Sequence, residues 1–392
     1  MSSNDLNNDH RKPSRLAFFI ATAVTFGIAF MVASPSNADV TVYESEDKAQ
    51  SFKVGAALKG GVDFDVTKGH DLDPEFTLNN ARIYTKAQVL EDVGFSVVAE
   101  YRQGDGFNLL DGFVYAKVND QLQLRAGQTK APFDRATLSS AFNRLTWNSS
   151  IISKYPAVYN KRNRGGALWG TFAIPVSEID AGVLGTIKPS LKYQAGVFEG
   201  IEGVKDIGDL LYAGRVQLNL LDGENEYTEA GNYFGTKNVL AIGTSLAFQN
   251  DALGVNKDDN YLAWSADVLF DSNIGTIPGN FTLAAAVNLY DLDNAPYVPG
   301  DGLNEGVGFS VEGAYLIPFE VPAGPLSGKI QPFVRYQQFE FDGFVDNGNE
   351  KQIDAGLNYV LAKNALVTVS YSHNELLGVK SDGVNAGIRF KF

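Results

Sequence analysis

The sequence contains no cysteine, which excludes a disulfide framework and leaves backbone pairing and packing as the sources of stability. Only three histidines occur among the 392 residues, and their spacing matches no histidine metal site. The chain also lacks a G-x-S-x-G nucleophile motif and a phosphate-binding glycine loop. After residue 38, no apolar run reaches the roughly 18 residues that predict a transmembrane helix. These absences argue against several classes of enzyme and against a helical membrane protein.

The first 38 residues have the pattern of a secretory signal peptide. A basic region precedes an apolar run from Leu16 to Ala33, and small residues follow at Ser36 and Ala38. We expect cleavage after Ala38, because this order of basic, apolar and small residues is typical of exported proteins. An uncleaved anchor is the alternative, since the run is long enough to span a bilayer, but the helix-breaking Pro35 favours cleavage. The basic residues are Arg11, Lys12 and Arg15.

Residues 39–392 are expected to form a single all-β domain. No Pro/Ser linker, low-complexity block or shift in composition divides them, and the chain is rich in glycine (40), tyrosine (17) and phenylalanine (26). The whole chain is acidic, with 46 acidic and 32 basic residues and a formal charge of −14.

Short stretches with period-two alternation recur along the chain, as in residues 80–89, 262–270 and 365–374. Successive side chains of a strand point to opposite faces, so each stretch has one apolar and one polar face. The polar faces carry mostly Gly, Ser, Thr, Asn and Gln, with occasional Arg or Lys. A soluble β-sandwich would place more charge on a face that meets bulk water. We therefore predict a transmembrane antiparallel β-barrel with a water-filled lumen.

The alternation predicts sixteen strands, an even number that places both ends of the barrel chain on one side. Tight turns are expected at one end of the barrel and longer, acidic loops at the other. The predicted strands are 52–64, 78–90, 92–103, 109–118, 121–129, 164–173, 189–198, 209–220, 236–249, 259–270, 278–290, 306–317, 328–341, 350–361, 364–373 and 382–392.

The last predicted strand, "DGVNAGIRFKF", alternates apolar residues and ends the sequence on an aromatic residue. This pattern resembles the signal that the outer-membrane barrel assembly machinery recognises, with Phe390 and Phe392 as its aromatic residues. An exposed apolar edge strand would promote aggregation, so we expect this strand to close the barrel against the first one. Together with the signal peptide, it indicates the outer membrane of a Gram-negative bacterium.

The segment from Lys130 to Arg164 is long, basic and without a strand or helix period. It contains seven basic residues against one acid, Asp134, and many large apolar residues. A structureless stretch of this length is usually functional, so we predict that this third outward loop folds into the barrel and narrows the pore. Its positive charge would then favour anions at a constriction. The alternative is a solvated loop surface, or a rim that binds lipopolysaccharide. The basic residues are Lys130, Arg135, Arg144, Lys154, Lys161, Arg162 and Arg164.

The same alternation directs more basic than acidic side chains into the lumen. A basic lumen would govern permeation, because acidic loops act over a Debye length of only about 8 Å at physiological salt. The inward bases are expected to be Lys53, Lys59, Arg82, Lys86, Arg102, Lys117, Arg125, Lys192, Arg215, Arg335 and Arg389. The inward acids are expected to be Asp63, Glu100, Asp111, Asp267, Glu312 and Asp354.

Four stretches resemble the phosphate-selective porin O and P family: "NNARIYTKAQV" (79–89), "LRAGQTKAPF" (124–133), "NRGGALWGTF" (163–172) and "YQAGVFEG" (193–200). The resemblance implies a sixteen-stranded barrel, usually trimeric, that passes phosphate or other small anions. It also implies that Arg125, Lys130 and Arg135 mark the basic mouth of the constriction.

The sequence as a whole predicts an outer-membrane porin for passive diffusion of small anions, and the resemblance implies selectivity for phosphate. A general diffusion porin is the alternative, and an adhesin or an outer-membrane lipid hydrolase is a more distant one. The hydrolase would need a Ser–His pair, for which Ser372 and His373 are the adjacent candidates. We expect no reaction and no cofactor, and we expect outer-membrane lipid, lipopolysaccharide and two further copies of the chain as partners.

Overall fold

The computed structural model describes residues 39–70, 72–157, 159–176, 179–201, 209–253, 259–293, 303–342, 348–362 and 364–392. The expected signal peptide, residues 1–38, lies outside the described residues. Helix is limited to single turns in these ranges, and none of them is long or apolar enough to span a membrane.

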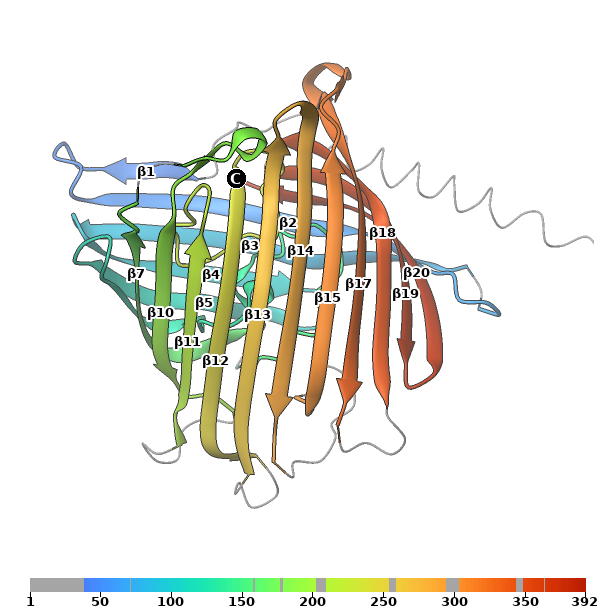
Figure 1. Ribbon diagram of the computed structural model, residues 1–392, viewed down its shortest axis with the longest axis horizontal. Helices are drawn as coiled ribbons and strands as arrows, with labels where there is room; N and C mark the ends of the chain where they lie inside the picture. The colour runs from blue at the N-terminus through green and yellow to red at the C-terminus, as the bar shows by residue number, and fades with distance from the viewer. Residues whose placement is uncertain are drawn as a thin grey trace, which may run out of the picture.

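Sixteen antiparallel strands form one closed barrel (Figure 1). All sixteen predicted strands are confirmed, most of them within two to four residues at each end. They are β2 (Ser51–Asp65), β3 (Pro74–Leu90), β4 (Val93–Arg102), β5 (Gly106–Lys117), β6 (Gln123–Lys130), β7 (Arg162–Ala173), β10 (Ser190–Phe198), β11 (Leu211–Asn219), β12 (Val239–Leu253), β13 (Asp259–Ile274), β14 (Ile277–Asp291), β15 (Gly306–Leu316), β17 (Gly328–Phe341), β18 (Asn349–Ala362), β19 (Ala365–Leu376) and β20 (Val379–Lys391).

The barrel closes where β20 pairs with β2, from Ala57 opposite Lys391 to Asp65 opposite Gly383. The terminal residue takes part, because the backbone groups of Phe392 and Ala56 exchange hydrogen bonds of 2.8 and 2.9 Å. A short strand that was not predicted, β1 (Val40–Glu44), pairs with β2 beyond the end of β20. The side chains of Phe390 and Phe392 stand together, with ring centroids 5.7 Å apart.

The other small elements are not part of the ring of sixteen strands. A second short strand, β16 (Glu320–Val321), pairs with β17, and β8 (Ile179–Asp180) forms a separate hairpin with β9 (Thr186–Ile187). The single helical turns are α2 (Arg135–Leu138), η2 (Gly182–Leu184) and η4 (Gly324–Leu326). Of these turns, only α2 lies in the long basic segment.

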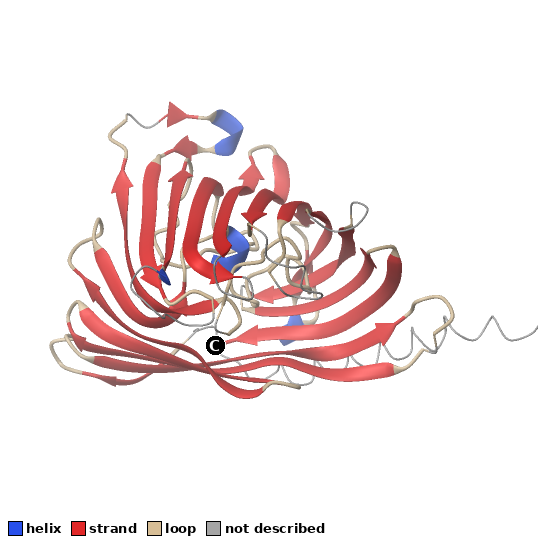
Figure 2. Ribbon diagram, turned by 90° about the horizontal axis from the view of Figure 1, so that it is seen from below, coloured by secondary structure: helices blue, strands red, loops and turns tan. Residues whose placement is uncertain are grey.

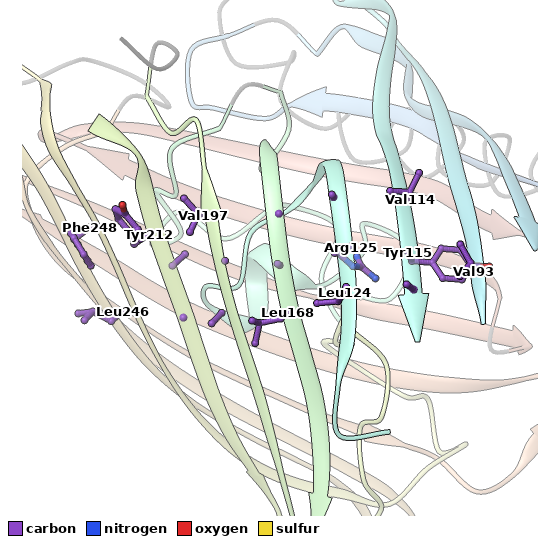
Figure 3. Close-up of a pocket in the computed structure, with 18 residues that line it drawn as sticks. Val93, Val114, Tyr115, Leu124, Arg125, Leu168, Val197, Tyr212, Leu246 and Phe248 are labelled. Carbon is purple, nitrogen blue, oxygen red and sulfur yellow. The ribbon is translucent and has the colours of Figure 1, made fainter. Parts of the chain in front are cut away.

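The outer wall is apolar, as the alternation predicts. Large apolar side chains such as Leu168, Leu246 and Phe248 are exposed on it. Across β5 to β12 this wall is hollowed by a shallow apolar groove, in which small residues such as Ala126 and Gly166 lie between larger ones (Figure 3). An exposed apolar wall of this kind suits a lipid environment rather than water.

Loop segments lie inside the ring of strands (Figure 2), and two long ones enter it from opposite ends of the barrel. The segment Ala131–Lys161, between β6 and β7, is held to the inner wall on several sides. Asn358 of β18 donates to the carbonyl of Leu145 at 2.9 Å, and Asn288 of β14 donates to that of Ile152 at 3.0 Å. From the opposite end, the connection 220–238 between β11 and β12 also enters the barrel, and its Tyr227 is 1% exposed.

Glycines on the inner wall make room for large side chains of the segment 131–161. A Cβ atom at Gly387 of β20 would stand 2.3 Å from the indole of Trp147 and 2.7 Å from the carbonyl of Gly60. A Cβ atom at Gly308 of β15 would stand 2.7 Å from Ile152. These distances are shorter than van der Waals contact, so glycine is required for this packing.

We expect Gly387→Ala to lower the stability of the barrel by about 1–3 kcal/mol, because the added methyl group overpacks the contact with Trp147. The measurement is the midpoint of urea unfolding in lipid vesicles, monitored by tryptophan fluorescence. Gly313→Ala is the matched control, since a Cβ atom there meets only the carbonyl of Thr282, at 3.8 Å. Equal midpoints for the two variants would contradict this prediction, because they would show that the side chain of Trp147 can move aside without loss of stability.

Candidate functional site

Seven basic side chains surround one polar cavity of about 200 Å³ between the segment 131–161 and the strands β2, β3 and β4. Among the residues that line it, Asp63 is the one acid. The bases are Lys59, Arg82, Arg102, Lys130, Arg144, Lys161 and Arg162. They come from four stretches of the sequence and meet only because the sheet is closed.

Three of these bases are neutralised by acids behind them. Nε of Arg82 lies 2.6 Å from the carboxylate of Glu100, which is fully buried. The guanidinium of Arg162 makes two bonds to Asp111, of 3.0 and 2.9 Å, in the bidentate geometry that arginine favours. Arg102 is more exposed and lies 3.4 Å from Asp105.

Lys59, Lys130 and Arg144 are different, because among the described residues no carboxylate lies within ion-pair distance of them. Nζ of Lys59 donates to the carbonyl of Trp147 at 2.7 Å and stands 4.3 Å from the centre of its ring. Nζ of Lys130 donates to the carbonyl of Ser139, and Arg144 donates to the hydroxyl of Ser149 at 2.7 Å. These neutral partners orient the three cations without cancelling their charge.

The electrostatic consequence is visible at Arg144. Burial, together with the nearby Arg335 and Arg82, lowers the pKa of Arg144 to about 10. The guanidinium remains charged at neutral pH, but in surroundings that disfavour the charge. An anion that entered the cavity would relieve this unfavourable interaction.

Two further cavities adjoin the cationic one and continue it toward the ends of the barrel. A cavity of about 420 Å³ shares Asp63 and Asn148 with it and reaches the end at which β2 finishes. A cavity of about 640 Å³ shares Lys130 and Arg162 with it and reaches the turn at Glu91, near the opposite end. The three cavities thus form a series along the barrel, with the cationic cavity in the middle.

Arg135, which was predicted to supply charge at a constriction, lines none of these three cavities. It lines a smaller one of about 80 Å³ that shares Ser139 and Arg144 with the cationic cavity. Its guanidinium is bonded to both oxygens of Glu224, at 2.9 and 2.8 Å. Nearby, Arg215 bonds to Glu229 at 2.9 Å and to Asp267 at 2.7 Å. Lys192 completes this group, 3.3 Å from Glu229. We name these three bases and three acids the clamp cluster; because it is buried and electrically balanced, it offers no charge to a permeating ion.

The remaining predicted bases are dispersed. Lys154 lies 3.7 Å from Glu350, Arg335 lies 2.7 Å from Asp354, and the exposed Arg164 lies 3.3 Å from Glu199. Around the larger of the two adjoining cavities stand Lys86, Lys117 and Arg125. Lys117 pairs with Asp120 at 2.8 Å, and the guanidinium of Arg125 stands 3.6 Å from the ring centre of Tyr227. Arg389 faces the interior, where it donates to the carbonyl of Arg144 at 2.6 Å.

The sequence reasoning missed the inward connection 220–238, and with it Glu224 and Glu229. Two features of its sequence could have identified it: its length and its aromatic residues Tyr227 and Phe234, which the structure shows to be buried. Length and large apolar residues also identified the segment 130–164. Connections at this end of the barrel were instead expected to be tight turns.

The histidine of the hydrolase alternative has a different partner. Nδ1 of His373 lies 2.7 Å from Asp382 of the adjacent strand β20. Ser372 points to the other side of β19 and borders the cavity near the end of β2. The structure therefore does not bring the two adjacent candidates together.

No protein-family model matches the chain, and no curated protein matches its sequence. Several solved structures do match its fold. A loop L8 deletion mutant of OmpT, an outer membrane protein of Vibrio cholerae, is 13% identical with a TM-score of 0.56, covering 88% of this chain and 100% of that one. The outer membrane channel DcaP of Acinetobacter baumannii is 14% identical with a TM-score of 0.55, covering 90% and 100%. An anion-selective porin from Comamonas acidovorans is 12% identical with a TM-score of 0.54, covering 88% and 100%. The chain thus has the barrel fold of these proteins.

The two kinds of arginine should differ in their effect on stability. Arg135→Gln leaves the carboxylate of Glu224 buried without its partner, so we expect a loss of about 3 kcal/mol. Arg144→Gln removes a cation that has no carboxylate partner among the residues that the structure describes, so we expect a change of about 1 kcal/mol or less. Urea unfolding in lipid vesicles measures both variants under the same conditions. Equal losses would contradict the assignment of Arg135 to a balanced cluster.

Proposed function

We propose that this protein is an outer-membrane channel through which small anionic solutes diffuse passively. The observation that carries the proposal is the cationic cavity, in which Lys59, Lys130 and Arg144 donate to neutral partners and have no carboxylate within ion-pair distance in the described part of the chain. Their field is poorly screened inside a narrow lumen, so anions are attracted and cations repelled. The position of the cavity between two larger ones supports this proposal.

The setting of the proposal is the outer membrane of a Gram-negative bacterium. It is supported by the apolar outer wall and the closed barrel. We propose that the barrel assembly machinery recognises the closing strand β20 with Phe390 and Phe392. We further propose export by cleavage of the signal peptide after Ala38, assembly as a homotrimer in contact with lipid and lipopolysaccharide, and no catalysed reaction or cofactor. One OmpT structure with this fold is described as a trimer form.

Phosphate is the proposed preferred solute, with a general diffusion porin as the second candidate. The resemblance of residues 124–133 to phosphate-selective porins favours phosphate. So do the guanidinium and ammonium groups around the cavity, because they can replace the hydration of a compact oxyanion. The general porin is favoured by the cavities of about 420 and 640 Å³ on either side, which impose no such selection.

The ion selectivity of the purified protein in a planar bilayer tests the proposal. Under a KCl gradient we expect a zero-current potential close to the chloride Nernst value. The double variant Lys59→Gln/Arg144→Gln should lower the anion-to-cation permeability ratio severalfold, because it removes two of the cations that lack a carboxylate partner. Arg164→Gln is the matched control: this arginine is exposed, pairs with Glu199 and does not line the cavity. A cation-selective wild-type channel would overturn the proposal.

Added phosphate distinguishes a phosphate-selective channel from a general diffusion porin. If phosphate binds in the cavity, it should block the chloride current in a concentration-dependent manner, and the block should weaken in Lys59→Gln/Arg144→Gln. An anion-selective channel that phosphate leaves unblocked would be a general diffusion porin.

A further inference from the structure

The connection 220–238 is the one described connection at its end of the barrel that is built into the interior with buried acidic side chains. Its neighbours differ: β13 and β14 are joined by a two-residue turn, and the connection 317–327 is exposed, with Phe319 75% exposed. In contrast, Glu224 and Glu229 are 2% and 4% exposed. Burial of a carboxylate is unfavourable unless it has a partner. Both carboxylates are paired with bases of the clamp cluster, and these pairs give the connection a defined place inside the barrel.

Its place is against the inner wall of β10 to β14. The amide of Gln194 on β10 donates to the carbonyl of Tyr227 at 2.8 Å. Further along, the backbone N–H of Tyr233 donates to Asp271 of β13 at 2.7 Å, and Asn232 donates to Thr282 of β14 at 3.2 Å. The clamp cluster adds the ion pairs with Lys192 and Arg215. The connection thus covers this part of the wall with side chains.

The connection also meets the segment 131–161, which enters from the other end. The hydroxyl of Tyr227 donates to the carbonyl of Lys130 at 2.8 Å. The backbone N–H groups of Gly231 and Asn232 both donate to the carbonyl of Asn143, at 3.0 Å. Since Arg135 bonds to Glu224 from the side of the segment, ion pairs and backbone hydrogen bonds join the two across the lumen.

The opposite side of the connection faces the proposed path. Asn225, Glu226 and Thr228 are exposed and border the cavity of about 640 Å³, which Lys86 and Phe113 border from strands β3 and β5. The connection is therefore a wall of this cavity, with the clamp cluster behind it.

We propose that the connection 220–238 is a second constriction element, held in place by the clamp cluster, that sets the size limit of the channel. It confines solutes to the half of the lumen that contains the cationic cavity. Glu224 and Glu229 act as positioning residues, since their ion pairs hold the wall, and Asn225, Glu226 and Thr228 are the residues that a solute meets. This inference rests on the proposed channel function and adds what limits the size of the solute.

Replacing residues 223–235 by a two-residue Asn-Gly turn removes the wall and exposes the bases of the clamp cluster to lumen water. We expect the single-channel conductance to rise roughly twofold or more and larger neutral sugars to enter in liposome swelling, because a wider lumen admits more and larger hydrated solutes. Shortening the exposed connection 317–327 is the control, and it should change neither quantity.

A cysteine variant tests the same wall with little disturbance of the fold, since the chain has no cysteine of its own. Thr228→Cys places a thiol on the cavity side of the connection, and a bulky thiol reagent added there should lower the conductance. Thr236→Cys is the matched control, because this threonine is also exposed on the same connection but does not line the cavity. Its modification should leave the current unchanged.

The outcomes separate this inference from the proposed function. If the wild-type protein forms no channels or a cation-selective one, the proposed function fails, and the inference fails with it. If it forms anion-selective channels, but the shortened variant keeps the same conductance and sugar limit and Thr228→Cys is not blocked, only the inference is overturned.

Discussion

The interior of this protein depends on the hydrogen-bonded pairing of β2 with β20, which turns a long sheet into a closed wall. A closed wall has no free edge, and alternate side chains of all sixteen strands must share one enclosed space. Charges in that space have to be paired or stabilised by water or by dipoles. The arrangement of its bases reflects this requirement more than the total charge of the chain does.

The structure separates the interior bases into two groups. Toward β10–β13, the clamp cluster matches each base with an acid, so this region is a filled and neutral support. Toward β2–β4, Lys59, Lys130 and Arg144 donate to carbonyl and hydroxyl oxygens, and among the described residues no carboxylate lies within ion-pair distance of them. An acidic protein can therefore have a basic cavity in its interior, while acids such as Asp65, Asp382 and Glu226 border the cavities on either side of it.

The strands were predictable from the sequence because their period is local. Each predicted stretch contains its own alternation, and the weakly charged polar faces of these stretches indicated a barrel rather than a sandwich. The partners of the charged side chains were not predictable in this way. Arg135 and Glu224 are 89 positions apart, and nothing near either residue indicates that they meet. A concentration of positive charge in the lumen was predictable, since Lys130, Arg144 and Arg162 belong to the basic segment. Its other wall, with Lys59 and Arg82, depends on how the barrel curves.

The contacts of the segment 131–161 have a consequence for the order of folding. Leu145 is bonded to Asn358, 213 positions away, and Arg144 to Arg389, 245 positions away. Contacts of such long sequence separation carry a large loop-closure entropy, and they form late. The segment can therefore take its final place only after the last strand is present. Until then its apolar side chains have no wall to pack against, so a nascent chain that lacks its final strands would need a chaperone to cover this segment.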